Sequence, residues 1–333
     1  MRKIAVLGAG GWGTALAILL HGNGHTVSLW EFFGERAHEL QRTRENVLFL
    51  PGVAVPREID ITDDICKALE DVSIIVFALP SHTMRNVAKL AAPHLTDQII
   101  SVNVAKGLER RTLKRMSQVL QEELPRGIRI ATLSGPSHAE EVSRGIPTAV
   151  VVASPDENMN LQIQMTFMTS YFRVYTNDDL IGTELAGSLK NVIAIAAGIC
   201  DGLNYGDNTK GALLTRGLAE ISRLGIAMGA RAQTFAGLSG MGDLITTCVS
   251  KHSRNRYVGE QAGRGMKLKQ VLDSMEMVAE GVNTTVSARS LANVKKVEMP
   301  ITEQVYLVLF EDKNPRQAVN DLMNRVAKAE IWW

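Results

Sequence analysis

Short hydrophobic runs alternate with stretches of helical periodicity along the first half of the chain. The runs that predict strands span residues 3–7, 26–31, 73–79, 98–104, 128–133, 148–153 and 172–175. Some, such as the run from Ile74 to Phe77, are apolar on both faces, which is typical of strands buried in a parallel sheet. Amphipathic helical patterns, among them residues 14–20 and 83–91, lie between the runs. The alternation predicts right-handed βαβ units and hence a doubly wound α/β domain.

The pattern changes near residue 177, where the strand-like runs stop. Helical patterns follow at residues 179–200, 210–228, 233–238, 254–262, 268–274, 284–294, 301–310 and 315–324. We therefore expect an α/β domain over residues 1–178 and an all-α domain over residues 179–333, with the change of pattern alone setting the boundary. A chain of 333 residues is long enough for two domains.

Composition and charge narrow the class of protein. Hydrophobic residues make up 45% of the chain and charged residues 21%, as in soluble globular proteins. Lys and Arg total 36 against 35 Asp and Glu, and this balance argues against a nucleic-acid binder. The sequence shows no apolar run of membrane-spanning length and no signal-peptide pattern at its start. The three cysteines and seven histidines lack ligand spacing, so we expect reduced thiols, no metal site and a cytoplasmic protein.

A glycine-rich segment directly follows the first predicted strand and opens the first helix. It fits G-x-G-x-x-G through Gly8, Gly10 and Gly13. In a dinucleotide-binding loop these glycines permit a tight turn, close approach to a pyrophosphate, and packing of the helix on the strand. The free N–H groups and positive dipole end of the helix then face the phosphates. The position between strand and helix is the context that this motif requires.

An acidic residue stands at the end of the second predicted strand. Glu31 follows Gly8 by 23 residues, about where a carboxylate binds the adenosine ribose hydroxyls. Such a carboxylate repels a 2′-phosphate, so the position favours NAD over NADP. The alternative for Glu31 is a solvated charge at a strand end. Trp12, inside the glycine loop, is alternatively a core residue.

Two lysines occupy unusual positions. Lys106 follows the strand predicted over residues 98–104, at the sheet edge where α/β proteins bind ligands. Lys190 is the one charged residue between Glu184 and Asp201, in a helix so apolar that we expect it to be buried all round. Burial lowers the pKa of a lysine and fits it for proton transfer near neutral pH. The alternatives are an ordinary loop lysine for Lys106, and a snorkelling or structurally paired lysine for Lys190.

Three further segments carry polar groups with a structural and a functional interpretation. Asp243, in the run GMGDLITT, stands where a helix N-cap would be. The run KHSRNR at residues 251–256 combines arginine with hydroxyl and amide groups at a helix start, which suits a phosphate, or is a solvated surface. Ser137 and Glu140 have the spacing of a capping box, and we interpret Glu140 as structural.

A resemblance to a known family rests on nine segments: GAGGWGTALA (8–17), FLPG (49–52), AKGLE (105–109), LSGPSHAEEV (133–142), ELAGSLKNVIAIAAGICDGL (184–203), GDNTKGALLTRGLAE (206–220), GLSGMGDLITTC (237–248), SRNR (253–256) and VAEGVNT (278–284). Through them the chain resembles the NAD(P)-dependent glycerol-3-phosphate dehydrogenases of bacterial type, nearly from end to end.

The resemblance implies a fold and a reaction. The fold is a Rossmann domain followed by an all-helical domain like that of 6-phosphogluconate dehydrogenase, with the active site between them, in a homodimer. The reaction is reversible hydride transfer with NAD or NADP between dihydroxyacetone phosphate and sn-glycerol 3-phosphate, which supplies glycerol 3-phosphate for phospholipid synthesis.

The resemblance also implies roles for single residues. Lys190 falls on the family's general acid/base lysine and Lys106 on a second lysine that contacts substrate and cofactor. Asp243 matches a substrate-binding position in the active site, and Thr247 a further active-site hydroxyl. The further substrate positions are Gly135, Ser137, Ser253, Arg254 and Asn255. The cofactor positions are Gly8, Gly10, Gly11, Trp12, Gly13, Glu31, Phe32, Phe49, Lys106, Ala139, Arg254, Val278 and Glu280.

Three positions depart from the family pattern. Gly11 stands where bacterial members usually have Ser or Ala, and Phe49 where they often have Tyr. Glu31, followed by two phenylalanines, stands where many carry a basic residue that meets a 2′-phosphate. Two alternatives to the family function remain: a related β-hydroxyacid or sugar-phosphate dehydrogenase, in which Arg254 has no phosphate to bind, and a non-catalytic NAD-binding sensor.

Overall fold

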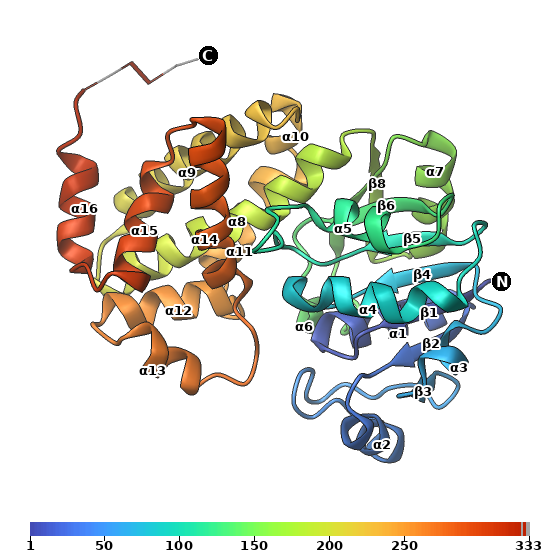
Figure 1. Ribbon diagram of the computed structural model, residues 1–333. Coiled ribbons are helices and arrows are strands. Elements are labelled where there is room, and N and C mark those ends of the chain that lie inside the picture. Colours follow the sequence, from blue (N-terminus) through green and yellow to red (C-terminus); the bar gives the residue numbers. More distant parts are fainter. Residues whose placement is uncertain (328, 331–333) are drawn as a thin grey trace.

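The computed structural model describes residues 1–327, 329 and 330, arranged as a sheet-containing part and a helical part that meet at one long helix (Figure 1). Residues 328 and 331–333 of the predicted second domain lie outside the described residues. The chain passes from the last strand, which ends at Asn177, to the long helix, which begins at Leu180.

Eight strands form one sheet in the order β3-β2-β1-β4-β5-β6-β7-β8. Their bounds are β1 Lys3–Leu7, β2 Thr26–Trp30, β3 Asp60–Thr62, β4 Ile74–Phe77, β5 Ile100–Asn103, β6 Arg129–Ser134, β7 Thr148–Ala153 and β8 Phe172–Asn177. Neighbouring strands are parallel except β6 and β7, which are antiparallel. The predicted doubly wound sheet is confirmed. The prediction that βαβ units repeat without interruption is wrong between β6 and β7. There the connection contains the one-turn helix α6 (Ala139–Val142) and no crossover helix.

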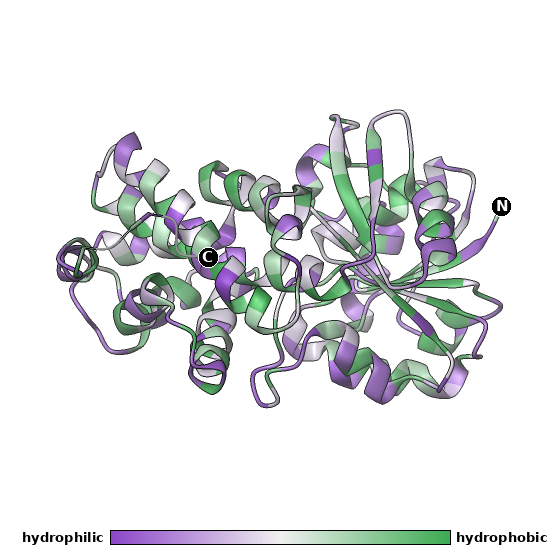
Figure 2. Ribbon diagram, turned by 90° about the horizontal axis from the view of Figure 1, so that it is seen from above, coloured by the Kyte–Doolittle hydropathy of each residue, from purple (hydrophilic) through white to green (hydrophobic). Residues whose placement is uncertain are grey.

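Helices cover both faces of this sheet, and Figure 2 shows hydrophobic stretches along the strands between them. Leu16 and Ile163, from α1 and α7, belong to the cluster on one face, whereas Val87 and Leu120, from α4 and α5, belong to the cluster on the other. The helices of this part are α1 Gly11–Gly22, α2 Gly34–Thr43, α3 Ile65–Leu69, α4 Met84–Ala91, α5 Met116–Glu123 and α7 Glu157–Phe167, with short 3₁₀ turns η1 Ser81–Thr83 and η2 Ala92–His94.

The second part is helical, as predicted. It comprises α8 Leu180–Gly202, α9 Asp207–Ala227, α10 Ala232–Phe235, the π-helical turn η3 Leu238–Gly242, α11 Asp243–Val249, α12 Arg254–Gly263, α13 Leu268–Asp273, α14 Glu280–Lys295, α15 Pro300–Phe310 and α16 Pro315–Met323. Every residue of α8 from Gly182 to Cys200 is buried, so the expectation of a helix buried all round is confirmed.

The central helix α8 also determines where the neighbouring helices lie. Within the described residues α8 alone has the length and hydropathy of a membrane-spanning helix, but 89% of that stretch is buried inside the protein, as in a core helix. α12 packs directly against α8. A Cβ atom at Gly259 of α12 would lie 1.9 Å from the carbonyl oxygen of Ile195, so glycine permits this close approach.

Candidate active site

The two predicted lysines meet at one buried carboxylate. Asp243, the first residue of α11, is 2% exposed. Its Oδ1 lies 2.6 Å from the Nζ of Lys190 in the middle of α8, and its Oδ2 lies 2.7 Å from the Nζ of Lys106, which follows β5. The sheet edge and the helical part thus contribute one ammonium group each to a shared carboxylate.

The burial of this cluster changes its protonation. Burial lowers the pKa of Lys190 to about 8, against the attraction of Asp243, and the nearby Lys106 cation lowers it further. Burial raises the pKa of the Asp243 carboxyl, but the two lysines outweigh it and hold that pKa below its usual value. Near neutral pH the cluster therefore holds an ionised carboxylate and a lysine that exchanges its proton readily.

A hydroxyl completes the surroundings of Lys190. Thr247 lies one turn after Asp243 in α11, and its Oγ1 accepts a hydrogen bond from the Lys190 Nζ. The same hydroxyl donates to Asp243 Oδ1 at 3.2 Å. Lys190 is 5% exposed, so the snorkelling alternative is wrong, and the lysine does belong to a buried ion pair. The ion pair is compatible with an acid/base role for Lys190, because the burial that requires a charged partner also lowers the pKa of the lysine.

Two alternative interpretations as helix caps do not hold. Gly242, not Asp243, is the N-cap residue of α11, and the Asp243 carboxylate is bound to the lysines. The predicted capping box at Ser137 and Glu140 is wrong as well. α6 begins at Ala139 with His138 as its N-cap residue, so Ser137 lies one position too early and its Oγ donates to the Gly135 carbonyl at 3.0 Å.

The Gly135 carbonyl also accepts a hydrogen bond from Lys106 Nζ, at 2.8 Å. The loop after β6 therefore shares the Lys106 ammonium group with Asp243. Two predicted substrate positions, Gly135 and Ser137, thus lie in the hydrogen-bonded surroundings of the lysine pair.

The start of α12 carries the predicted phosphate ligands. Ser253 is its N-cap residue and accepts from the Arg256 backbone N–H at 3.2 Å. Asn255 donates from Nδ2 to Asn191 Oδ1 at 2.9 Å and accepts the Gly281 N–H at 2.8 Å, which ties α12 to α8 and α14. The Arg254 guanidinium has no hydrogen bond or ion pair to any other described residue, so it is available to an anion.

The glycine loop has the shape that a dinucleotide requires. A Cβ atom at Gly13 would lie 1.9 Å from the Gly8 carbonyl oxygen, so the close packing of α1 on β1 needs a glycine there. At Gly10 a Cβ atom would meet no described atom within 4 Å, and it would fill the open cradle at the start of α1. The chain itself leaves Gly10 unconstrained, so the residues present fit a bound pyrophosphate.

The other predicted cofactor positions surround this loop. Glu31 follows β2, is 7% exposed, and accepts the Phe33 N–H at 3.1 Å. Burial raises its pKa, opposed by that hydrogen bond. Gly11 packs closely against Phe49, because a Cβ atom there would lie 2.6 Å from the Phe49 carbonyl oxygen, and it would lie 3.7 Å from the Ala139 Cβ. Phe32 is 58% exposed.

Two predicted cofactor positions turn toward the protein instead. The Trp12 ring lies 6.4 Å from that of Phe172, which agrees with the core alternative. Glu280 begins α14 and accepts hydrogen bonds from Ser81, at 2.7 Å from its N–H and 2.5 Å from its Oγ, so it links the two parts of the chain. Val278, two residues earlier, is partly exposed.

Sequence reasoning missed residues that hold the site together. Asn191 donates to the Lys106 carbonyl at 3.3 Å and accepts from Asn255, so it connects the lysine pair with the start of α12. Its position beside Lys190 in an otherwise apolar helix was the available signal. Glu184, also on α8, accepts from the Ser117 N–H at 2.8 Å and pairs with Arg115, across the two parts.

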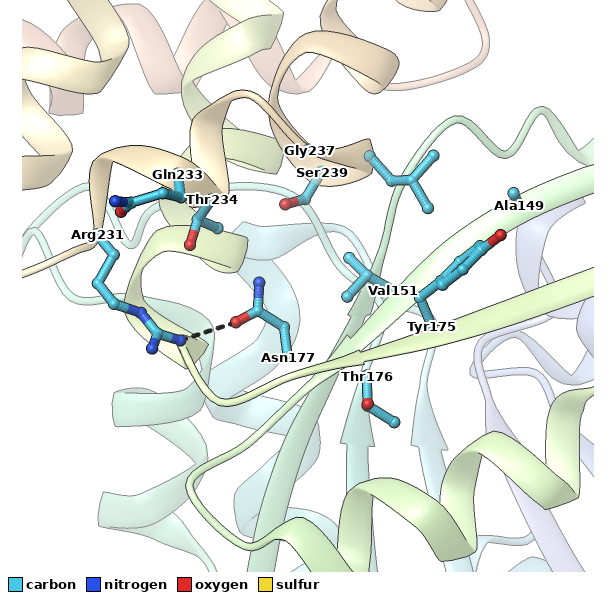
Figure 3. Close-up of a pocket in the computed structure, with 11 residues that line it drawn as sticks. Ala149, Val151, Tyr175, Thr176, Asn177, Arg231, Gln233, Thr234, Gly237 and Ser239 are labelled. Atoms are coloured by element: carbon cyan, nitrogen blue, oxygen red, sulfur yellow. Dashed lines mark hydrogen bonds between the residues drawn. The ribbon is translucent and has the colours of Figure 1, made fainter.

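A separate cavity lies beside the site. It has a volume of about 730 Å³ and lies between β7, β8 and the segment from Arg231 to Ser239 (Figure 3). Its lining residues differ from all of the predicted site residues. Arg231, at its rim, donates to Asn177 at 3.1 Å. The two lysines and Asp243 thus lie outside this cavity. The turn η3 contributes to the cavity lining and directly precedes Asp243.

Comparisons with known proteins agree with this geometry. Residues 3–160 match the family model "NAD-dependent glycerol-3-phosphate dehydrogenase N-terminus", and residues 179–320 match that of the C-terminus. A "Glycerol-3-phosphate dehydrogenase [NAD(P)+]" of Pelotomaculum thermopropionicum is 55% identical over 97% of this chain and 93% of its own length. A protein of the same name from Fusobacterium nucleatum is 52% identical over 99% of both chains.

Solved structures give the same result. The crystal structure of glycerol-3-phosphate dehydrogenase from Coxiella burnetii matches with a TM-score of 0.94 and 38% identity, over 97% of this chain and 99% of that one. A ketopantoate reductase of Ralstonia eutropha shares the fold alone, with a TM-score of 0.61 and 14% identity. This chain belongs to the NAD-dependent glycerol-3-phosphate dehydrogenase family.

Proposed function

We propose that this chain interconverts sn-glycerol 3-phosphate and dihydroxyacetone phosphate with NAD(P), in a site formed between a domain over residues 1–178 and a domain over residues 179–333. The observation that carries the proposal is the shared carboxylate of Asp243 between Lys190 and Lys106. The same chain has a dinucleotide loop and, at a helix start, an arginine without a hydrogen bond or ion pair to another described residue. The names of the family's members agree with it.

Lys190 acts as the general acid and base. During reduction its ammonium group donates a proton to the oxygen of the substrate carbonyl, and during oxidation its amine takes the proton back. Its pKa of about 8 lets it do both near neutral pH. Lys106 stabilises negative charge on the same oxygen. Asp243 and Thr247 hold the Lys190 side chain in place through their hydrogen bonds.

The start of α12 holds the substrate phosphate. Arg254 presents a guanidinium group whose planar donors suit phosphate oxygens, and Ser253 and Asn255 add a hydroxyl and an amide. The free N–H groups at the helix start favour the same anion. Gly135 and Ser137 complete the substrate site from the loop after β6. Fixing the phosphate positions the carbonyl carbon for reaction.

The cofactor binds across the glycine loop. The backbone of Gly8, Gly10, Gly11, Trp12 and Gly13 would hold the pyrophosphate at the start of α1. Glu31, Phe32 and Phe49 would hold the adenosine end. Lys106, Ala139, Arg254, Val278 and Glu280 would supply the remaining contacts. When bound, the dinucleotide supplies or accepts the hydride. Because the Glu31 carboxylate repels a 2′-phosphate, we propose that NAD is preferred over NADP.

We further propose a cytoplasmic homodimer that supplies glycerol 3-phosphate for phospholipid synthesis, as the family resemblance implies. Light scattering on the purified protein tests the dimer directly.

The first experiment follows NADH and NADPH absorbance with dihydroxyacetone phosphate, for wild type and Lys190→Ala side by side. We expect oxidation by wild type that falls by about 10²- to 10⁴-fold in the variant, the usual contribution of a general acid. Retained NADH binding in the variant is the control. A higher kcat/KM with NADH than with NADPH supports the role of Glu31. If wild type turns over neither cofactor, the substrate assignment is wrong.

A further inference from the structure

One buried ring nitrogen beside the lysine pair lacks a partner. The Nε2 atom of His138 is almost fully buried and makes no hydrogen bond to any described residue. The other four side-chain atoms in this condition are hydroxyl oxygens, which rotate to find partners. An imidazole nitrogen is fixed by its ring, and leaving it unpaired costs about 1–3 kcal/mol. A polar atom kept at that cost points to a group that is absent from the free protein.

The location of His138 indicates which group that is. It lies in the loop after β6, between the predicted substrate position Ser137 and the first residue of α6. Its ring faces His252 across the two parts of the chain, with 5.9 Å between the ring centroids. His252 directly precedes Ser253 and Arg254, the proposed phosphate ligands. The ring therefore lies near the residue that precedes α12 and within electrostatic reach of the acid/base lysine.

The charges around the ring come from several elements. Lys190 on α8 and Lys106 after β5 act on it as cations, and Asp243 on α11 and Glu140 on α6 act as anions. Burial lowers the pKa of His138, and Lys190 and Lys106 lower it further. The ring is therefore neutral near pH 7 and offers one N–H donor and one acceptor. With the proton on Nε2, this nitrogen is a donor for which no described residue supplies an acceptor, and an oxygen of a bound molecule can accept from it.

We propose that His138 is a substrate-binding residue, whose Nε2 forms a hydrogen bond with an oxygen of the bound triose phosphate. The proposal rests on the proposed function, because it takes the substrate from there. His138 is not among the substrate positions that the family resemblance implies. It positions the substrate from the sheet side, opposite the ligands on α12.

Three variants test this contact at saturating NADH. In His138→Gln the amide nitrogen falls near the position of Nε2, whereas in His138→Asn it falls short of it, and His138→Phe keeps only a ring. We expect KM for dihydroxyacetone phosphate to rise by about 10-fold or more in the Asn and Phe variants, the usual effect of losing a hydrogen bond to a charged or polar ligand. The Gln variant retains a KM within about threefold of wild type. KM for NADH stays unchanged in all three.

The matched control is His25→Gln, at a partly buried histidine that contacts the Thr166 carbonyl far from the site. Inorganic phosphate as a competitive inhibitor then identifies the substrate oxygen. A parallel rise in its inhibition constant assigns the contact to the phosphate, and an unchanged constant assigns it to the triose.

Two results overturn the inference. If His138→Asn and His138→Phe fold, bind NADH and leave KM for dihydroxyacetone phosphate unchanged, the nitrogen has only a structural role. If all three variants, including Gln, lose kcat and NADH binding together, the ring supports the fold instead of the substrate. Failure of the proposed function is distinct, because wild type itself then shows no turnover.

Discussion

Replacing Asp243 by Asn removes the charge that keeps Lys190 protonated. At 2.6 Å and an effective dielectric constant of ~20, the attraction between the two groups is roughly 6 kcal/mol. Relaxation of the protein compensates for about half of this attraction when the charge is removed. The other half is lost, which lowers the pKa of Lys190 by about two units, at 1.36 kcal/mol per unit. The pKa then moves from about 8 to about 6. Repulsion from the unpaired Lys106 acts in the same direction.

The two directions of the reaction respond differently. Reduction needs the protonated lysine, so its rate falls as pH rises through the pKa of Lys190. At pH 7 the protonated fraction drops from about nine-tenths in wild type to about one-tenth in Asp243→Asn, and kcat for reduction falls at least about tenfold. Oxidation needs the neutral amine, so the same shift does not lower its rate at pH 7.

The assay is a pH profile of kcat in both directions for wild type, Asp243→Asn and Thr247→Val. The threonine variant removes a hydrogen bond to Lys190 but keeps the carboxylate, so its alkaline limb of reduction should stay near that of wild type. The reasoning is refuted if the alkaline limb of Asp243→Asn stays near pH 8, or if both directions fall equally at every pH.

Further predictions concern three single positions. Gly10→Ala should change the unfolding free energy by less than about 1 kcal/mol, because the added Cβ meets no described atom within 4 Å. The same Cβ enters the space for the pyrophosphate, so NADH binding should weaken at least about tenfold. Gly13→Ala, measured in the same calorimetric titration and thermal melt, should lose both stability and binding, since its Cβ collides with a carbonyl oxygen. Glu220→Gln should lower the unfolding free energy by about 1–3 kcal/mol in urea, with KM unchanged, because the buried carboxylate accepts two backbone N–H groups at the start of α15. A urea midpoint equal to that of wild type would contradict it.

Hydrophobic patterning predicted the sheet well where strands are buried. All seven predicted runs correspond to strands, because a buried parallel strand needs an apolar run. The eighth strand, β3, was missed because it is short and lies at the sheet edge, where Asp60 and Thr62 flank a single apolar residue. The helix α11 was missed too. It follows a π-helical turn, and its polar residues serve the site, so helical periodicity is weak there.

The sequence singled out candidate site residues where a residue contradicts its surroundings. Lys190 stands out in an apolar helix and Lys106 at the end of a strand, and each was found without knowledge of the other. Their meeting at Asp243 was beyond the sequence, because Asp243 lies 53 residues from Lys190 and 137 from Lys106 along the chain. Local patterns favoured caps at Asp243 and Ser137, since short polar residues near helix starts usually cap. Tertiary partners overrode both preferences.

The charge of the cluster explains why it is built from two parts of the chain. Two ammonium groups and one carboxylate leave one net positive charge in a largely buried cluster. An isolated cation there is costly, so Asp243 must hold both lysines until a substrate arrives. The oxygen that gains negative charge during reduction then meets a cation already in place, without reorganisation of the protein. Because Lys106 comes from the sheet and Lys190 with Asp243 from the helices, this arrangement exists only while the two parts are docked. Contacts such as Glu280 with Ser81, and Glu184 with Ser117, therefore support catalysis as well as the fold.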